Sequence, residues 1–266
     1  MGRMVLEKIV SLKVAIKNPL LIFFIGAVVS ISCLIVSYLV FETSLGLFST
    51  FLVTIAMMPF MLNLARYEEA RQEEILIAGK GYGILQRYRD ILKVYVSFFC
   101  GMILALSLLY IALPEAVVTD LFQDQITQIN LIRGKFDFSG TFTKIVLNNT
   151  GVLFLSFLFS FLFGAGAVFI LAWNASVLST AIGMAAQTIG GLGGLPLAVL
   201  IFFPHGSLEI LAYFIGGIAG GFVSVAITRK KSMGFWLVVK DSFKLMIVSL
   251  VLLVVAGVIE TIAIVA

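Results

Sequence analysis

The sequence predicts an all-α membrane protein, a polytopic bundle of about six or seven transmembrane helices. Apolar residues make up 61% of the 266 positions and charged residues only 12%, whereas soluble domains are nearer half apolar and a quarter charged. Several uncharged runs reach about 20 residues, the length that crosses the hydrocarbon core as a helix. The basic residues also lie almost entirely on one side of these runs, as expected for spans with a fixed orientation.

Seven segments are long and apolar enough to span the membrane. They are Leu20–Val40, Ser44–Leu64, Val94–Leu113, Gly151–Trp173, Ala175–Gly190, Ser207–Ile227 and Phe243–Ile264. The first is too long for a cleaved signal peptide and lacks a small-residue cleavage site, so we interpret it as a retained anchor. The short joint at 41–43 predicts that the first two spans form a hairpin.

Alternating these segments across the bilayer separates the basic residues by side. One side carries 15 of them and the other only 3, namely Arg133, Lys135 and Lys144. The positive-inside rule therefore predicts a multi-pass plasma-membrane protein with a cytoplasmic amino terminus, a cytoplasmic 66–93 loop and an external 114–150 loop. With seven crossings, the carboxyl terminus would lie outside.

Both larger loops are predicted to be helical. In the cytoplasmic 66–93 loop, charges of both signs recur at three- and four-residue spacings, which predicts a helical hairpin broken at Gly79, Gly81 and Gly83. The GKGYG stretch lacks the strand–turn–helix context of a phosphate loop. Outside, an apolar stripe over 115–132 predicts an amphipathic helix, which could lie on the membrane surface or cap the bundle.

The stretch FFPHGSLE places Pro204, His205, Gly206 and Glu209 inside an apolar region. A helix over 195–227 would be about 50 Å long, against a hydrocarbon core of roughly 30 Å. Because proline ends or begins helices, we predict a break here, with a half-membrane segment at 195–206 entered through glycines 190–194. Pro204 would then open a new helix carrying His205 and Glu209 on one face.

Two interpretations of this polar insert remain open. An ionisable side chain in a span costs about 2.5–3.5 kcal/mol on insertion scales and is a functional-site candidate; discontinuous helices bind ions or substrates in transporters. Alternatively, His205 and Glu209 tie the broken helix to its neighbours through Asn148, Asn149 or Asn174. We favour the structural tie, since no second buried acid or base lies nearby in sequence.

Small residues predict close helix packing in the same region. Gly216 and Gly220, like Gly217 and Gly221, are spaced four apart, a pattern that lets helices touch. We expect this face to pack internally, although a dimer seam is the alternative. Asn148, Asn149 and Thr150 match a glycosylation pattern, but we expect them to cap a helix that starts near Gly151.

Catalysis and cofactors are not indicated. One histidine and two cysteines cannot build a usual structural zinc site, and HGSLE is not the H-E-x-x-H helix of metalloproteases. Ser207 and His205, two apart on a helix, do not face each other as a nucleophile and base would. We therefore expect no catalytic residues, no metal, no cofactor and no nucleic-acid partner.

The pattern of Asn148-Asn149, Asn174 and Pro204-His205-Gly206-x-x-Glu209 before a glycine-rich span resembles the stage II sporulation protein M (SpoIIM) family. The likeness is greatest over about 144–231, and the first 113 residues look like the extended amino-terminal part of archaeal-type members. The resemblance implies a polytopic, non-enzymatic membrane protein. In spore formers, members anchor and localise cell-wall hydrolases during septal remodelling.

Three regions and two functions follow as expectations. The regions are a three-helix membrane part with its hairpin (1–113), an external amphipathic segment (114–143) and a SpoIIM-like membrane core (144–266). The leading hypothesis is a membrane scaffold whose segments 115–143 and 66–93 recruit protein partners, including envelope enzymes or a second copy of the chain. The alternative is a channel or transporter with a polar cavity at Pro204–Glu209.

Overall fold

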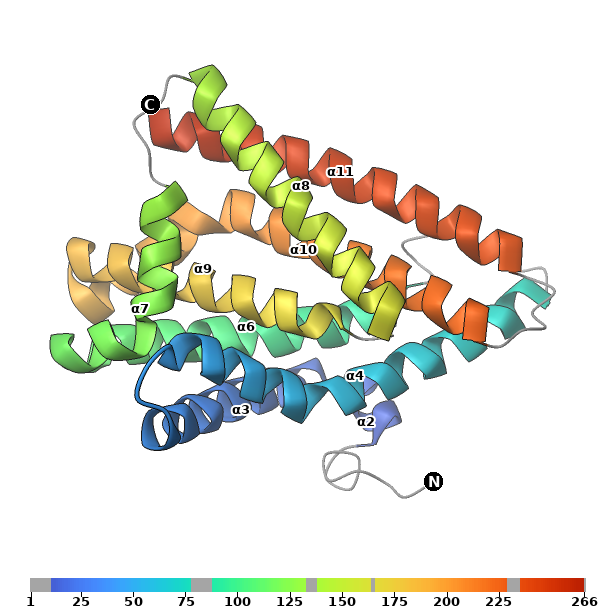
Figure 1. The fold of residues 1–266 in the computed structure, drawn as a ribbon, viewed down its shortest axis with the longest axis horizontal. Helices are drawn as coiled ribbons and strands as arrows, with labels where there is room; N and C mark the ends of the chain where they lie inside the picture. Colours follow the sequence, from blue (N-terminus) through green and yellow to red (C-terminus); the bar gives the residue numbers. More distant parts are fainter. Residues whose placement is uncertain (1–10, 78–87, 133–137, 164–165, 229–234, 266) are drawn as a thin grey trace.

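The computed structural model describes residues 11–77, 88–132, 138–163, 166–228 and 235–265. Within them the chain is helical throughout (Figure 1), with no strand. The elements are α2 (Leu12–Lys17), α3 (Pro19–Val40), α4 (Leu45–Ile77), α6 (Arg89–Ala112), α7 (Glu115–Ile132), α8 (Phe138–Phe163), α9 (Ala167–Ile189), the short 3-10 helix η1 (Gly191–Gly194), α10 (Leu195–Thr228) and α11 (Phe235–Val265). In these ranges seven helices are long and apolar enough to cross a membrane, which confirms the predicted all-α polytopic bundle.

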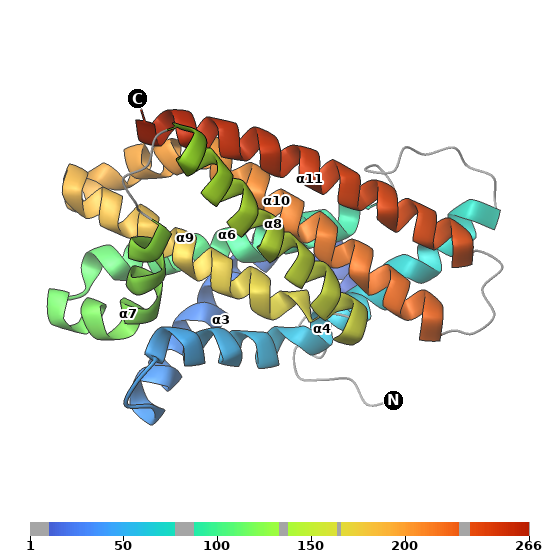
Figure 2. The same ribbon diagram turned by 45° about the horizontal axis from the view of Figure 1, so that its top comes forward.

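Helix α9 lies at the centre of the arrangement. It contacts α4, α6 and α7 on one side and α8 and α10 on the other (Figures 1 and 2). Around it, α3 packs closely on α6, while α10 packs on both α8 and α11. The small residues of α9 permit these contacts, because Ala172, Ala175 and Ser179 are fully or almost fully buried.

Helices α3 and α6 approach each other through two glycines. A Cβ at Gly26 would collide with the backbone carbonyl of Phe98, and one at Gly101 would collide with that of Phe23. Only glycine allows backbones to come this close. Phe98 and Phe99 beside this contact are completely buried and meet edge to face.

Helix α7 caps one end of the bundle. The predicted apolar stripe is buried at Val118, Leu121, Phe122 and Ile129, and the helix packs against α4 and α9. Asp124 accepts a hydrogen bond from the backbone N–H of Leu47 at 3.1 Å, at the amino-terminal end of α4. Gln125 donates to Ser176 Oγ of α9, also at 3.1 Å. The sequence left two placements open for this helix, on the membrane surface or as a cap on the bundle. In the structure it caps the bundle.

Opposite charges link α4 and α6 at the other end of the bundle. The guanidinium of Arg71 lies 2.6 Å from Asp90 and 3.4 Å from the fully buried Glu68. Partial burial lowers the pKa of Arg71, but the hydrogen bond to Asp90 and the charges of Glu68 and Asp90 outweigh it and raise the pKa. The predicted break at Gly79, Gly81 and Gly83 lies outside the described residues.

The predicted boundary between the fourth and fifth spans was wrong. The structure has α8 over Phe138–Phe163 and α9 over Ala167–Ile189, with the joint at 164–166, not near residue 174. Hydropathy is continuous across this joint, so apolar run length alone did not reveal it. As a consequence, Asn148, Asn149 and Thr150 lie inside α8 and cap no helix.

The predicted half-membrane break at 195–206 was also wrong. Helix α10 runs unbroken from Leu195 to Thr228 with Pro204 inside it. Proline removes one N–H, the donor to the carbonyl of Leu200, and in membrane helices this loss is tolerated because neighbouring groups re-satisfy the backbone. Tilt accommodates a helix longer than the bilayer is thick. The glycine turn that enters α10 is present, with positive φ at Gly190 and Gly191.

Candidate intramembrane polar site

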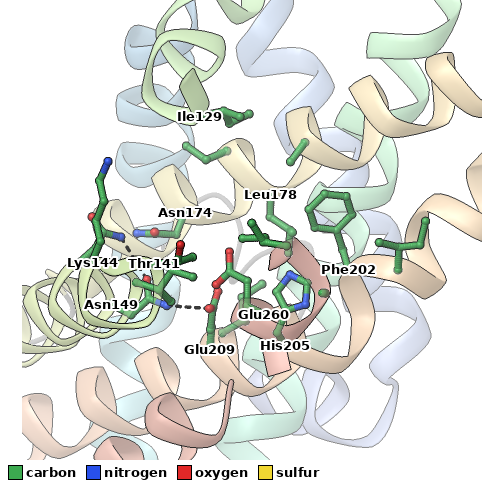
Figure 3. Close-up of a pocket in the computed structure, with 18 of the residues that line it drawn as sticks. Ile129, Thr141, Lys144, Asn149, Asn174, Leu178, Phe202, His205, Glu209 and Glu260 are labelled. Atoms are coloured by element: carbon green, nitrogen blue, oxygen red, sulfur yellow. Dashed lines mark hydrogen bonds between the residues drawn. The ribbon is translucent and has the colours of Figure 1, made fainter. Parts of the chain in front are cut away.

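A pocket of about 420 Å³ lies between α8, α9, α10 and α11, with Ile129 of α7 at its edge (Figure 3). It is near the start of α8 and the end of α11, the end of the bundle where α7 packs (Figure 1). Its size is in the range of small-molecule sites. Apolar walls from Leu178, Phe202 and Ile210 surround a few converging polar groups.

Two carboxyl groups meet inside the pocket. Glu209 comes from α10 and Glu260 from α11, both are half-buried and line the pocket, and their side chains lie beside each other (Figure 3). A carboxylate has no proton to donate, so a hydrogen bond between two carboxyl groups requires one of them to be protonated. Two neighbouring carboxyl groups of this kind can hold one proton between them, because two carboxylates repel each other.

A chain of amides leads to Glu209. Asn148 Nδ2 donates to Asn149 Oδ1 at 3.1 Å, and Asn149 Nδ2 donates to Glu209 Oε1 at 2.6 Å. Asn149 is buried, whereas Asn148 is exposed. Glu209 therefore accepts from the amide chain on one side and lies beside Glu260 on the other.

His205 lies one helical turn before Glu209 and faces the same pocket. Its side chain is only 7% exposed, and its Nδ1 atom has no hydrogen-bond partner among the described residues. The ring is tilted against Phe202, with 5.7 Å between centroids. Buried polar atoms are nearly always hydrogen-bonded, so an unpartnered nitrogen in a cavity indicates a group available to a ligand.

The other sequence-predicted site residues divide into two groups. Asn174 lines the pocket, but its Nδ2 donates to the carbonyl of Ile170 on its own helix, at 2.7 Å. Pro204 is exposed, and Gly206 packs near Leu178; neither is among the lining residues. Five of the predicted site residues therefore line one pocket: Asn148, Asn149, Asn174, His205 and Glu209. Pro204 and Gly206 belong to the same helix, α10, but do not line it.

Sequence reasoning missed Glu260. It is an acid within the last apolar run, and the rule that makes Glu209 a candidate applies equally to it. The two acids are far apart in sequence, so only the packing of α10 on α11 reveals the pair. Tyr213 and Lys144 also line the pocket. The ammonium of Lys144 donates to the carbonyl of Leu131 at 2.9 Å and points away from the carboxyl groups (Figure 3).

The glycines predicted for helix packing lie beyond the pocket on α10, and all four are buried. A Cβ at Gly216 would collide with Leu153, and one at Gly220 with the backbone carbonyl of Phe157, both of α8. At Gly217 it would come within 2.8 Å of Ala167 Cβ at the start of α9. Within the described chain, these contacts seal α10 against α8 and α9.

The charged groups do not form a metal centre of the usual kind. Among the residues that the structure describes, no three His, Cys, Asp or Glu side chains are close enough together to hold a metal ion.

Comparison with known proteins gives one match. The family model described as SpoIIM, stage II sporulation protein M, matches residues 20–263. No curated protein and no solved structure matches the chain.

Proposed function

The chain belongs to the stage II sporulation protein M family, and we propose that it is a proton-coupled carrier of a small solute. The pocket between α8, α10 and α11 is its binding site. The observation that carries the proposal is the pair of neighbouring carboxyl groups, Glu209 and Glu260, which line one pocket between membrane-spanning helices.

The surroundings of the pair favour this function over a purely structural tie. A tie that only joined helices would be packed on all sides, because protein interiors leave few voids larger than water. Here the carboxyls border a cavity of about 420 Å³, and the buried His205 leaves Nδ1 without a partner. Ionisable side chains inside spans, where proton and solute compete for the same acids, are a recurring feature of transporters.

Transport requires the pocket to open alternately toward each side of the membrane. The pocket lies toward the α7 end, and its other side is closed by the contacts of Gly216, Gly217 and Gly220 with α8 and α9. Close glycine contacts lack interlocking side chains, so helices can slide along them. In this proposal the glycine contact is the gate on that side.

Vesicle flux tests the proposal. Purified protein is reconstituted with an entrapped pH dye, and sodium, potassium, ammonium and alkylamine salts are added outside. We expect at least one salt to move protons in wild-type vesicles, and Glu209→Gln and Glu260→Gln to remove that signal. The control is Glu115→Gln, an exposed acid on α7. Equal signals in wild type and both pocket variants would refute the carrier.

A membrane scaffold is the second candidate, and the rigid attachment of α7 favours it. Asp124 and Gln125 fasten this helix to α4 and α9, while Glu115, Thr119 and Asp120 face outward. A fixed polar surface outside the membrane suits docking of an envelope protein better than a loose segment would, because little order is lost on binding.

Site-specific crosslinking tests the scaffold. A photoreactive residue at Asp120 should capture the same protein partner in repeated native-membrane preparations, whereas one at the exposed Phe163 of α8 should not. If both positions capture the same proteins, or neither captures any, α7 is not a docking surface.

We also propose that the protein resides in the plasma membrane with its amino terminus in the cytoplasm. The 15-to-3 division of basic residues between the two sides supports this orientation. Cysteine-accessibility labelling at Glu115, after removal of the native Cys33 and Cys100, should report an external position. Labelling only after cell lysis would reverse the topology.

A further inference from the structure

We infer that the ligand of the pocket is a small organic cation, a primary amine in its protonated form, bound between Glu209 and Glu260 in place of their shared proton. This inference rests on the proposed function for the movement of the ligand, whereas the binding itself stands on the geometry of the site.

The acceptors in the pocket match an ammonium group. Glu209 and Glu260 present carboxyl oxygens, and His205 presents the unpartnered Nδ1 from the same face of α10. A primary ammonium has three N–H donors and no acceptor. The two carboxyl groups can accept from it, and His205 Nδ1 is, among the described residues, the one buried polar atom without a partner that belongs to a residue lining this pocket.

The walls of the pocket match an alkyl chain. Leu178, Phe202 and Ile210 line the cavity beside the acids. A small inorganic cation would leave these apolar surfaces uncovered, whereas an alkyl chain buried against them stabilises the complex through the hydrophobic effect. The volume of about 420 Å³ accommodates a short-chain amine.

Binding releases one proton. In this inference the empty pair shares one proton and carries one negative charge. The incoming ammonium adds one positive charge, the shared proton leaves to water, and two carboxylates remain beside one ammonium. One carboxyl O–H bond is broken, and total charge is conserved.

The other charged and titratable groups of the pocket are few. Helix α10 contributes His205 and Tyr213, α11 contributes Glu260, and α8 contributes Lys144; the residues lining the pocket from α7 and α9 are not titratable. Lys144 repels a bound cation, but its ammonium is hydrogen-bonded to Leu131 and points away from the carboxyl groups.

Calorimetric titration of the detergent-solubilised protein with n-butylammonium tests binding. Butan-1-ol and butyrate, which lack the positive charge, should bind at least about tenfold more weakly. Glu209→Gln and Glu260→Gln keep the side-chain shape and should each weaken n-butylammonium binding by about 10- to 100-fold. Glu115→Gln is the control and should bind as wild type does. Equal binding of butan-1-ol, or an equal loss in the control, would overturn the inference.

Two further readouts sharpen the test. Titrations in buffers of different ionisation enthalpy should report about one proton released per amine bound, as the shared-proton pair requires; zero protons would contradict the exchange. Lys144→Met should strengthen amine binding by a few-fold because a like charge is removed. Weaker binding of n-butylammonium in that variant would mean that Lys144 does not repel the ligand, and would contradict this placement of the positive charge.

The binding inference and the transport proposal can each be refuted without the other. If n-butylammonium binds as described but wild-type and Glu260→Gln vesicles show equal flux, the site is an amine-binding site and the carrier proposal is wrong. If vesicles exchange another solute through Glu209 and Glu260 while no amine binds, the carrier stands and the ligand class is wrong.

Discussion

The two halves of α10 pack against the same neighbour, α8, in opposite ways. From Ile201 to Tyr213, the helix borders the cavity of about 420 Å³ that holds the polar groups. From Gly216 to Gly220, the backbones are so close that an added Cβ would strike Leu153 or the carbonyl of Phe157. Along α10, polar side chains therefore occur where there is space between this helix and α8, and glycines occur where the two backbones touch.

The difference has a physical origin. Without a hydrophobic effect between helices in lipid, association depends on close contact and on interhelical hydrogen bonds. The glycine half uses close contact, and the polar half uses the Asn149–Glu209 bond at 2.6 Å. Either half can hold α10 to α8, but only the polar half leaves room for a ligand.

The largest expected effect comes from filling the tight half. Gly220→Ala places a methyl group against the backbone carbonyl of Phe157, which cannot rotate away. Overpacking costs about 1–3 kcal/mol and occasionally more, and a backbone carbonyl yields less than a side chain does, so the melting temperature in detergent should fall most here. Gly151→Ala on α8 is the matched control, because its Cβ would meet nothing within 4 Å. Similar melting temperatures for both variants would show that the contact is not tight.

Removing the acid in the polar half should have an intermediate effect. Glu209→Ala leaves the buried Asn149 without its acceptor, a loss of about 1–3 kcal/mol in the free energy of unfolding. Glu209→Gln keeps an acceptor oxygen and should lose less. In a double-mutant cycle, Asn149→Ala and Glu209→Ala should be coupled by about 0.5–3 kcal/mol. Additive effects would mean that the hydrogen bond contributes nothing.

The smallest expected effect is a gain at the edge of the cavity. Gly206→Ala would place a Cβ 3.4 Å from Leu178 Cδ2, an ordinary contact with a flexible side chain. Because glycine inside a helix is about 0.5–1 kcal/mol less favourable than alanine, the melting temperature should rise slightly. A loss as large as that of Gly220→Ala would mean that both halves of α10 are equally crowded.

The sequence was sufficient to predict the class of fold. Run length and charge distribution identified seven spans, and an apolar stripe located α7, because these properties are local. The joint between α8 and α9 was not predictable in this way, since apolar residues continue through it. Pro204 was expected to end a helix, but a proline's effect depends on whether neighbours compensate the lost N–H, which sequence does not state.

The candidate site was predictable in part. Asn148, Asn149, His205 and Glu209 stand out as polar residues in apolar runs, and the structure places all four on one pocket. Glu260 could have been found by the same criterion. Its pairing with Glu209 could not, because it depends on how α11 crosses α10.

The reciprocal glycine contacts between α3 and α6 have a consequence for how the chain can be divided. Gly26 and Gly101 hold the segment before residue 78 to the segment after residue 87 without any help from the connection between them, and the Arg71–Asp90 ion pair adds a second clasp. Co-expressed fragments 1–77 and 88–266 should accordingly assemble and co-purify. Gly101→Leu should abolish this complementation while leaving each fragment inserted.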